Sequence, residues 1–381
     1  YIERGMGPLL GTIAGVGTWF SLSFKGALAL VGGVPYLLIL FNLPAEPVAL
    51  GLAAVLILIN IVGAKQTGRL QVVIVVVMLA ALGWFAAGSA PLVESANYAD
   101  FFGDGIGGLL AATGLVFVSY AGVTKVASVA EEVKHPGRNL PRAILGSMAI
   151  MTVLYVAVVG AVVGLSDPDI LKTGGPGGTA SLTPMADGAG ALLGGVGVLF
   201  ISIVAVVALT SMANAGVLSS SRFPLAMSRD DLLPPGLSRI DSRFRTPRNA
   251  VLLTGVVLLL LIAFVPVIEL AKLASAFQIL VFSVINAALV AFREADVPSY
   301  TPEFEAPGYP YVQIFGFLAG LGLLTQMGTL PILGAAGIIA GSGLIYAFYG
   351  RHRTDRTGAI GTILHDRRGE ADDGLAPTDP E

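Results

Sequence analysis

Residues 108–132, GLLAATGLVFVSYAGVTKVASVAEE, form the stretch of sequence that decides the fold. From Gly108 to Ala130 the stretch holds one charged residue, Lys125. Roughly 20 mostly apolar residues are enough for an α-helix to cross the hydrocarbon core of a bilayer. The sequence therefore predicts a membrane-spanning helix over residues 106–129.

Nine further stretches of the same kind lie on either side of this one. They are near 9–38, 47–64, 70–90, 143–165, 189–218, 249–267, 270–292, 312–330 and 332–349. The composition agrees, since 55% of the 381 residues are hydrophobic and only 12% are charged, whereas soluble domains average about 25% charged residues. We predict an all-α, multi-pass protein of the cell membrane with about ten transmembrane helices, surrounded by the lipid bilayer.

The basic residues provide a test of the number of helices. If the N-terminus is cytoplasmic and every helix crosses once, eighteen of the 22 lysines and arginines fall in cytoplasmic segments. Only Lys172 and Lys272 fall outside, while Lys25 and Lys125 lie within helices. Cytoplasmic loops of membrane proteins carry an excess of positive charge. The pattern therefore favours an even number of helices with this orientation.

Several classes of function are disfavoured by what the sequence lacks. The net charge is −3 and no basic block is present, so no nucleic-acid partner is expected. The chain has no cysteine, and its three histidines lie apart in polar stretches, so we predict no metal and no cofactor. An enzyme embedded in the membrane would need an acidic or metal cluster, and the only candidate pair is Glu131 with Glu132. We predict that the protein is not an enzyme.

The middle of the opening stretch, Phe117-Val118-Ser119-Tyr120-Ala121-Gly122, places polar and small residues at about half the depth of the membrane. Transporters commonly bind substrate at this depth, where a helix is interrupted and its backbone groups face a cavity. Gly122 permits such an interruption, and Ser119 and Tyr120 supply polar contacts. The alternative is an ordinary transmembrane helix that contains a glycine.

Four segments resemble the amino acid–polyamine–organocation (APC) permeases. AEEVKHPGRNLPRAIL (130–145) is similar to the loop after that superfamily's sixth helix, with His135 in place of the usual Asn, and the preceding Phe117…Tyr120-Ala121-Gly122 is similar to its interrupted helix. SRFPLAMSRDDLLPPGLSRIDSRFRTPRNA (221–250) resembles the loop after the eighth helix. FEAPGYPYVQIFG (304–316) and GAKQTGRLQ (63–71) resemble the entries to the eleventh and fifth helices.

The resemblance implies a twelve-helix transporter with a five-plus-five inverted repeat (LeuT-like), of which residues 1–350 supply helices three to twelve. Residues 351–381 would form a polar cytoplasmic tail or a linker. The implied function is secondary active transport of amino acids or related amines by alternating access, with Phe117, Val118, Ser119, Tyr120, Ala121 and Gly122 binding the substrate. We expect two front helices to be missing, one of which carries the Gly-rich break that binds the substrate's amino and carboxylate groups. The chain as given would then insert in membranes without transporting. The alternative is a sensor or scaffold that keeps the permease fold and does not transport.

Residues for ion coupling are less well defined, and the coupling ion would be a proton or sodium. Some proton-coupled relatives place a lysine in the fifth helix, but the corresponding position here, near Val77, is apolar. The remaining candidates are Lys25, Lys125, Thr210, Ser211 and Asn214. A lysine buried in a membrane is costly and suggests function, although both lysines could instead extend toward the membrane surface. For the three polar residues the alternative is hydrogen bonding between helices.

Overall fold

The computed structural model describes residues 7–63, 68–122, 133–175, 178, 180–294 and 302–353. These residues form helices and no strands. The helices are α2 (Pro8–Leu40), α3 (Ala45–Val62), α4 (Gly68–Ser89), α5 (Gly105–Val116), α6 (Pro136–Leu165), α7 (Pro168–Thr173), α8 (Pro184–Arg229), α9 (Arg248–Phe264), α10 (Val267–Glu294), α11 (Tyr311–Gln326) and α12 (Thr329–Phe348). Short 3-10 turns are η1 (Ala90–Leu92), η2 (Ser95–Tyr98), η3 (Phe117–Tyr120), η6 (Pro235–Leu237) and η7 (Gly350–His352).

Within the described residues, seven helices are long and apolar enough to cross a membrane, and three shorter helices are also apolar. Each of the ten overlaps one of the ten apolar stretches found in the sequence. The prediction of an all-α, multi-pass membrane protein is confirmed. The polar segment from residue 354 onward lies outside the described residues, so its prediction as a tail or linker stays a prediction.

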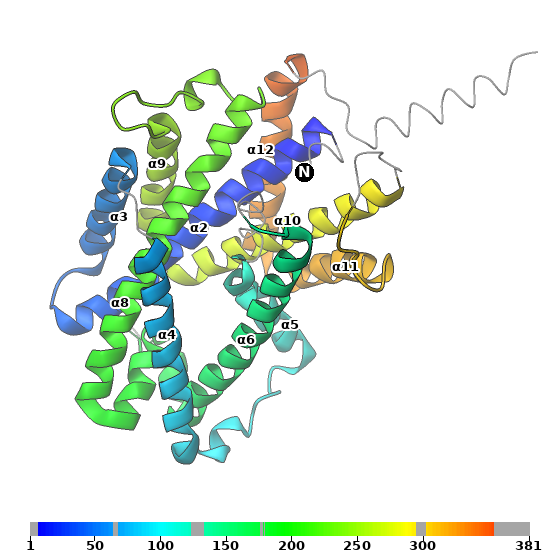
Figure 1. The fold of residues 1–381 in the computed structure, drawn as a ribbon. Helices are drawn as coiled ribbons and strands as arrows, with labels where there is room; N and C mark the ends of the chain where they lie inside the picture. Colours follow the sequence, from blue (N-terminus) through cyan, green and yellow to red (C-terminus); the bar gives the residue numbers. More distant parts are fainter. Residues whose placement is uncertain are drawn as a thin grey trace, which may run out of the picture.

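The long helices α2 and α8 run through the middle of the molecule and pack against each other in opposite directions (Figure 1). Gly15 of α2 lies against Met227 near the end of α8, and Gly33 lies against Leu209. Between these points the two backbones touch, because a Cβ built on Gly216 would lie 3.0 Å from the Cα of Gly26. Small residues allow such close approach between helices in lipid.

The remaining helices pack around this pair. α10 lies along α2, with Phe277 against Phe24 at a ring-centroid distance of 5.3 Å. α11 and α12 cover α10, α3 packs on α9, and α4 contacts both α6 and α8 (Figure 1). The largest buried cluster joins α2, α3, α8, α9 and α10 and includes Val118 of η3. The core therefore reaches the turn that the sequence predicts as a binding segment.

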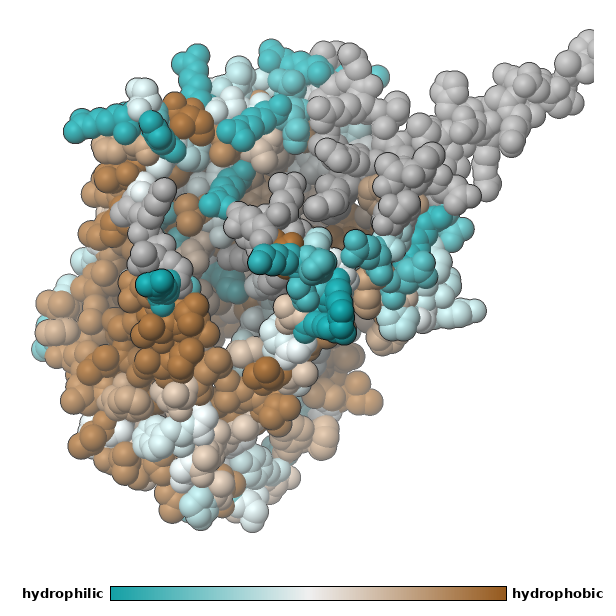
Figure 2. Space-filling model, viewed as in Figure 1, coloured by the Kyte–Doolittle hydropathy of each residue, from teal (hydrophilic) through white to brown (hydrophobic). Residues whose placement is uncertain are grey.

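Contacts between loops show which segments share a face. Thr246 Oγ donates to the carbonyl of Ile61 at 2.7 Å, so the end of α3 lies beside the start of α9. Gly350, at the end of α12, lies against Leu232, which follows α8. In Figure 2 hydrophilic side chains gather at the upper end of the molecule and on its right side, and hydrophobic ones cover most of the lower left. The end of α3, the start of α9, the end of α12 and the loop after α8 are all predicted to be cytoplasmic. The two contacts agree with their lying at the same end of the molecule.

The sequence placed the sixth helix at 189–218, and this boundary is wrong at its N-terminal side. α8 is interrupted at Leu193 (φ −134°, ψ 19°) and Gly194 (φ 59°, ψ −145°). Gly194 has the positive φ that glycine adopts readily. Residues 184–192 therefore form a separate helical segment, and the spanning helix begins after the break.

Candidate functional site

The α-helical geometry of α5 ends at Val116, inside the stretch of residues 108–132 that is predicted to span the membrane. The 3-10 turn η3 follows over Phe117–Tyr120, and the amide of Ala121 donates to the carbonyl of Val118 at 3.1 Å instead of to the carbonyl of Phe117. The helix therefore changes geometry where the sequence predicts an interruption. Its role in substrate binding stays a prediction.

Ser275 of α10 joins the two sides of this change in geometry. Its hydroxyl donates to the carbonyl of Leu115 at 2.6 Å and accepts a hydrogen bond from the amide of Val118 at 3.0 Å. In a continuous α-helix the amide of Val118 would donate to Gly114. In a membrane such freed backbone groups need a partner, and Ser275 supplies it. Ser275 is not among the residues predicted from the sequence, although a serine within an apolar helix was a signal for it.

The six predicted binding residues lie in two environments. Val118 and Ala121 are buried, 9% and 1% exposed, and they fix the turn to the core. Ser119 and Gly122 are exposed, and a Cβ built on Gly122 meets no atom of the described residues within 4 Å. Tyr120 is partly buried and its hydroxyl lies 3.2 Å from the hydroxyl of Thr152 on α6. The turn therefore presents Ser119 and Gly122 to open space.

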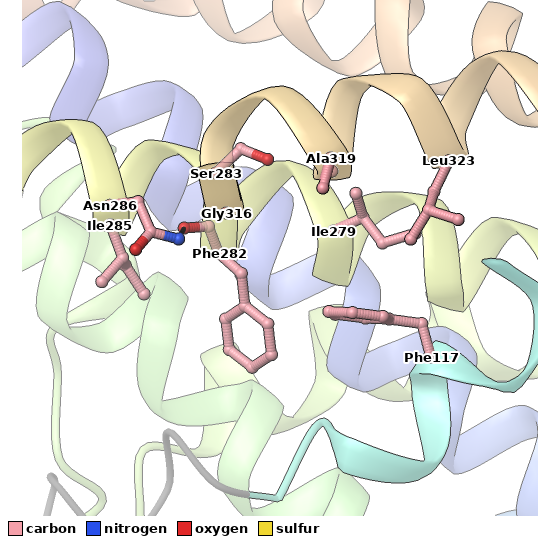
Figure 3. A pocket seen from close by; sticks show the side chains of 10 residues that line it. Phe117, Ile279, Phe282, Ser283, Ile285, Asn286, Gly316, Ala319 and Leu323 are labelled. Atoms are coloured by element: carbon pink, nitrogen blue, oxygen red, sulfur yellow. Dashed lines mark hydrogen bonds between the residues drawn. The ribbon is translucent and has the colours of Figure 1, made fainter. Parts of the chain in front are cut away.

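The sixth residue, Phe117, lines a cavity of about 360 Å³ between α10 and α11. Figure 3 shows Phe117 and Leu323 at one end of this cavity and Ile285 and Asn286 at the other. Phe117 also contacts the ring of Phe282 edge-on at 5.5 Å. The walls are mainly apolar, and the buried hydroxyl of Ser283 has no hydrogen-bond partner within the described parts of the chain. The cavity suits an apolar group rather than a charged one.

Lys25 lies at the middle of α2, with more than about 20 Å of helix on either side at 1.5 Å per residue. Lys25 is therefore far from both ends of its helix. Lys25 is partly buried, and no hydrogen bond or ion pair links it to another residue of the described ranges. Lys125 and the pair Glu131 and Glu132 lie outside those ranges. An ion-coupling role for either lysine stays a prediction.

The three polar candidates of α8 lie near α3 and α4. Ser211 donates to the side chain of Gln71 on α4 at 2.9 Å, and Asn214 accepts a hydrogen bond from Asn60 of α3 at 2.7 Å. Thr210 is partly buried. Hydrogen bonding between helices thus accounts for Ser211 and Asn214, and an ion-coupling role for the three stays a prediction. The described residues contain no group of three His, Cys, Asp or Glu that could hold a metal ion.

Comparison with known proteins agrees with this arrangement of helices. A family model described as amino acid permease matches residues 1–350. A branched-chain amino acid permease of Bacillus subtilis is 29% identical over 339 residues, which cover 89% of this chain and 70% of the relative. A methylthioribose transporter of the same organism is 31% identical over 72% of this chain, and the match spans 57% of that relative. The cationic amino acid transporter 3 of Arabidopsis thaliana is 32% identical over 53% of this chain and 32% of its own length.

The match to the family model extends through nearly all of the described helices, from α2 to α12, and includes η3 with its link to α10. The named relatives are permeases and transporters. Both the pattern of helices and these matches identify the fold predicted from the motifs. The chain belongs to the amino acid permease family, within the APC superfamily.

Proposed function

We propose that the protein is a secondary active transporter of the cell membrane that carries neutral aliphatic amino acids, through alternating access around the turn at residues 117–122. The turn supports this proposal because α-helical geometry ends there, within a stretch that the sequence predicts to span the membrane, and because Ser119 and Gly122 are exposed. Interrupted helices at this depth bind substrates in many secondary transporters.

The choice of an aliphatic substrate rests on the cavity beside Phe117. Its walls include Ile279, Phe282 and Leu323, and its volume of about 360 Å³ is ample for a branched side chain. Burial of a Leu, Ile or Val side chain in such surroundings is favourable by about 1.5–3 kcal/mol. The relative that matches 89% of this chain is named as a branched-chain amino acid permease, which agrees with the proposal.

The proposal is tested by uptake of radiolabelled leucine, isoleucine and valine into proteoliposomes that hold the full-length protein. Saturable uptake that unlabelled leucine suppresses is the expected result. An imposed pH gradient and an imposed sodium gradient, tested separately, identify the coupling ion. Leucine that binds the purified protein but never accumulates in the vesicles would instead support a sensor or scaffold.

Gly122 provides a sharper test of where the substrate binds. Gly122→Leu should abolish uptake with little effect on folding, because the new side chain would extend into space that no described residue fills. Gly146→Leu is a matched control, since Gly146 on α6 is also exposed and a Cβ built on it meets no described atom within 4 Å. Equal uptake by both variants would show that the space beside Gly122 is not part of the path.

A further inference from the structure

We propose that Lys25 determines the charge selectivity of the transport path, so that substrates with a cationic side chain are excluded and those with a neutral or anionic side chain are accepted. This inference rests on the proposed function and extends it to a residue outside the interrupted helix.

The neighbours of Lys25 on α2 indicate its direction. Ser21, one turn earlier and about 40° around the helix, bonds to the carbonyl of Ala274 and the side chain of Gln278 on α10. Gly26, about 100° around on the other side, lies against Leu258 of α9 and the backbone of α8. Lys25 therefore projects between α10 on one side and α8 with α9 on the other. α10 and α8 each pack on α2 and have no extensive contact with one another.

The face of α2 that carries Lys25 borders space that the described residues leave open. Gly32 lies two turns after Lys25 and only about 20° away around the helix. A Cβ built on Gly32 would meet no described atom within 4 Å. The face thus carries a lysine next to a region that the described residues leave open.

α10 connects the surroundings of Lys25 to the turn at 117–122. The turn of α10 that bonds Ser21 through Ala274 also bonds Val118 through the neighbouring Ser275. Val118 and Phe24, the residue before Lys25, belong to the same buried cluster. Lys25 therefore lies about one helical turn from a residue of α2 that shares this part of α10 with the turn at 117–122.

The electrostatic consequence follows from these positions. Within the described helices Lys25 is the one Asp, Glu, Lys or Arg side chain that lies near the middle of a spanning helix. Away from water, like charges repel more strongly than they do in bulk solvent. A second cation in the path would raise the energy of both charges, whereas a neutral side chain would not.

The experiment compares pairs of substrates that differ in one ammonium group. Norleucine and norvaline compete with labelled leucine for binding to the wild-type protein, and lysine and ornithine compete at least tenfold less well. Lys25→Met should raise the ratio of lysine affinity to norleucine affinity at least tenfold, whereas Lys25→Arg keeps the wild-type ratio. Lys272→Met is the matched control. It removes the same charge from a lysine at the start of α10 that is paired with Glu269, and the ratio should not change.

The outcomes separate this inference from the proposed function. If the wild-type protein binds no leucine, the proposed function is wrong. If it binds leucine but binds lysine as well as norleucine, charge selectivity is wrong while the proposed function stands. An unchanged ratio in folded Lys25→Met would show that another group excludes cations. If Lys25→Met does not fold, Lys25→Gln and the wild-type comparison of lysine with norleucine still decide the question.

Discussion

The hydroxyl of Ser275 has more influence on the candidate site than its size suggests. It is fully buried and contacts backbone groups on both sides of the boundary between α5 and η3. An unpaired backbone group in a membrane interior is costly. One side chain of α10 therefore stabilises the conformation of the turn in which Ser119 and Gly122 are exposed.

Ser275→Ala should lower the stability of the purified protein by about 1–3 kcal/mol, because the amide of Val118 loses its partner. Uptake should fall with it. Ser220→Ala is the matched control, since Ser220 is equally buried but its hydroxyl bonds only to carbonyls of its own helix. Thermal unfolding in detergent measures both variants. A Ser275→Ala protein as stable as Ser220→Ala would show that the bridge is dispensable.

Three helices, α3, α4 and α8, are joined by polar side chains on consecutive turns of α8. Ser211 donates a hydrogen bond to Gln71. Asn60 donates to Asn214 and also to the carbonyl of Leu56. Hydrogen bonds between transmembrane helices contribute about 0.6 kcal/mol on average. The cluster therefore orients the three helices while adding little to overall stability.

Ser211→Ala should cost about 0.6 kcal/mol of stability and leave the ion dependence of uptake unchanged, if hydrogen bonding between helices is its whole role. Thermal unfolding and uptake under opposed pH and sodium gradients measure the two effects. Loss of ion dependence at wild-type stability would instead assign Ser211 to coupling. Ser219→Ala, whose hydroxyl donates to the carbonyl of Ala215 in the same helix, controls for the loss of a hydroxyl from α8.

The loop between α8 and α9 is organised by Asp241, whose carboxylate accepts hydrogen bonds from the amides of Arg243 and Phe244, both at 2.9 Å. These bonds favour the charged form and lower the pKa of Asp241 below its ordinary value of 3.8. Because folding lowers this pKa, the stabilising effect on the loop is complete above the ordinary value. It is lost as the pH falls through the lowered one.

Hydrogen exchange of the Arg243 and Phe244 amides checks this prediction. Both should exchange faster in Asp241→Ala than in the wild-type protein at neutral pH, and the difference should vanish at strongly acidic pH. Asp241→Asn keeps an acceptor oxygen without a titrating charge, so its protection should not vary with protonation of this side chain. A difference that persists in strong acid would contradict the assignment.

How much of this could be predicted from the sequence depends on the range of the interaction. The ten helices follow from apolar runs, and the change of geometry at 117–122 follows from local residues. The bridge from Ser275 to Val118 spans 157 residues of sequence and depends on α10 lying beside η3. The break at Gly194 was missed because glycine is also common inside transmembrane helices. Its positive φ becomes evident only in the folded chain.

At the scale of the whole molecule, segments that the sequence predicts to be cytoplasmic lie against one another. Gly63 at the end of α3 lies against Phe244 and Thr246, and Gly137 lies against Glu303. Each contact joins two segments that would lie on opposite sides of the membrane if an odd number of helices crossed it between them. The excess of positive charge predicts that these segments face the cytoplasm, and this orientation stays a prediction.

Single cysteines introduced into this chain, which has none of its own, test the orientation. Arg239→Cys should resist a membrane-impermeant thiol reagent in intact cells, and Ser95→Cys should react, because both positions are exposed but lie at opposite ends. Permeabilised cells, in which both should react, are the control. Rapid labelling of Arg239→Cys in intact cells would show that this loop faces the outside, which would contradict the predicted orientation.

The backbones of α2 and α8 touch at Gly26 and Gly216, and the same two helices are also in contact at Gly15 with Met227 and at Gly33 with Leu209. Along α2 these contacts extend over about 27 Å at 1.5 Å per residue. The two helices are therefore held together as one unit, because a change in the angle between them would separate an outer contact. A side chain at either central glycine would push the two backbones apart along this whole length.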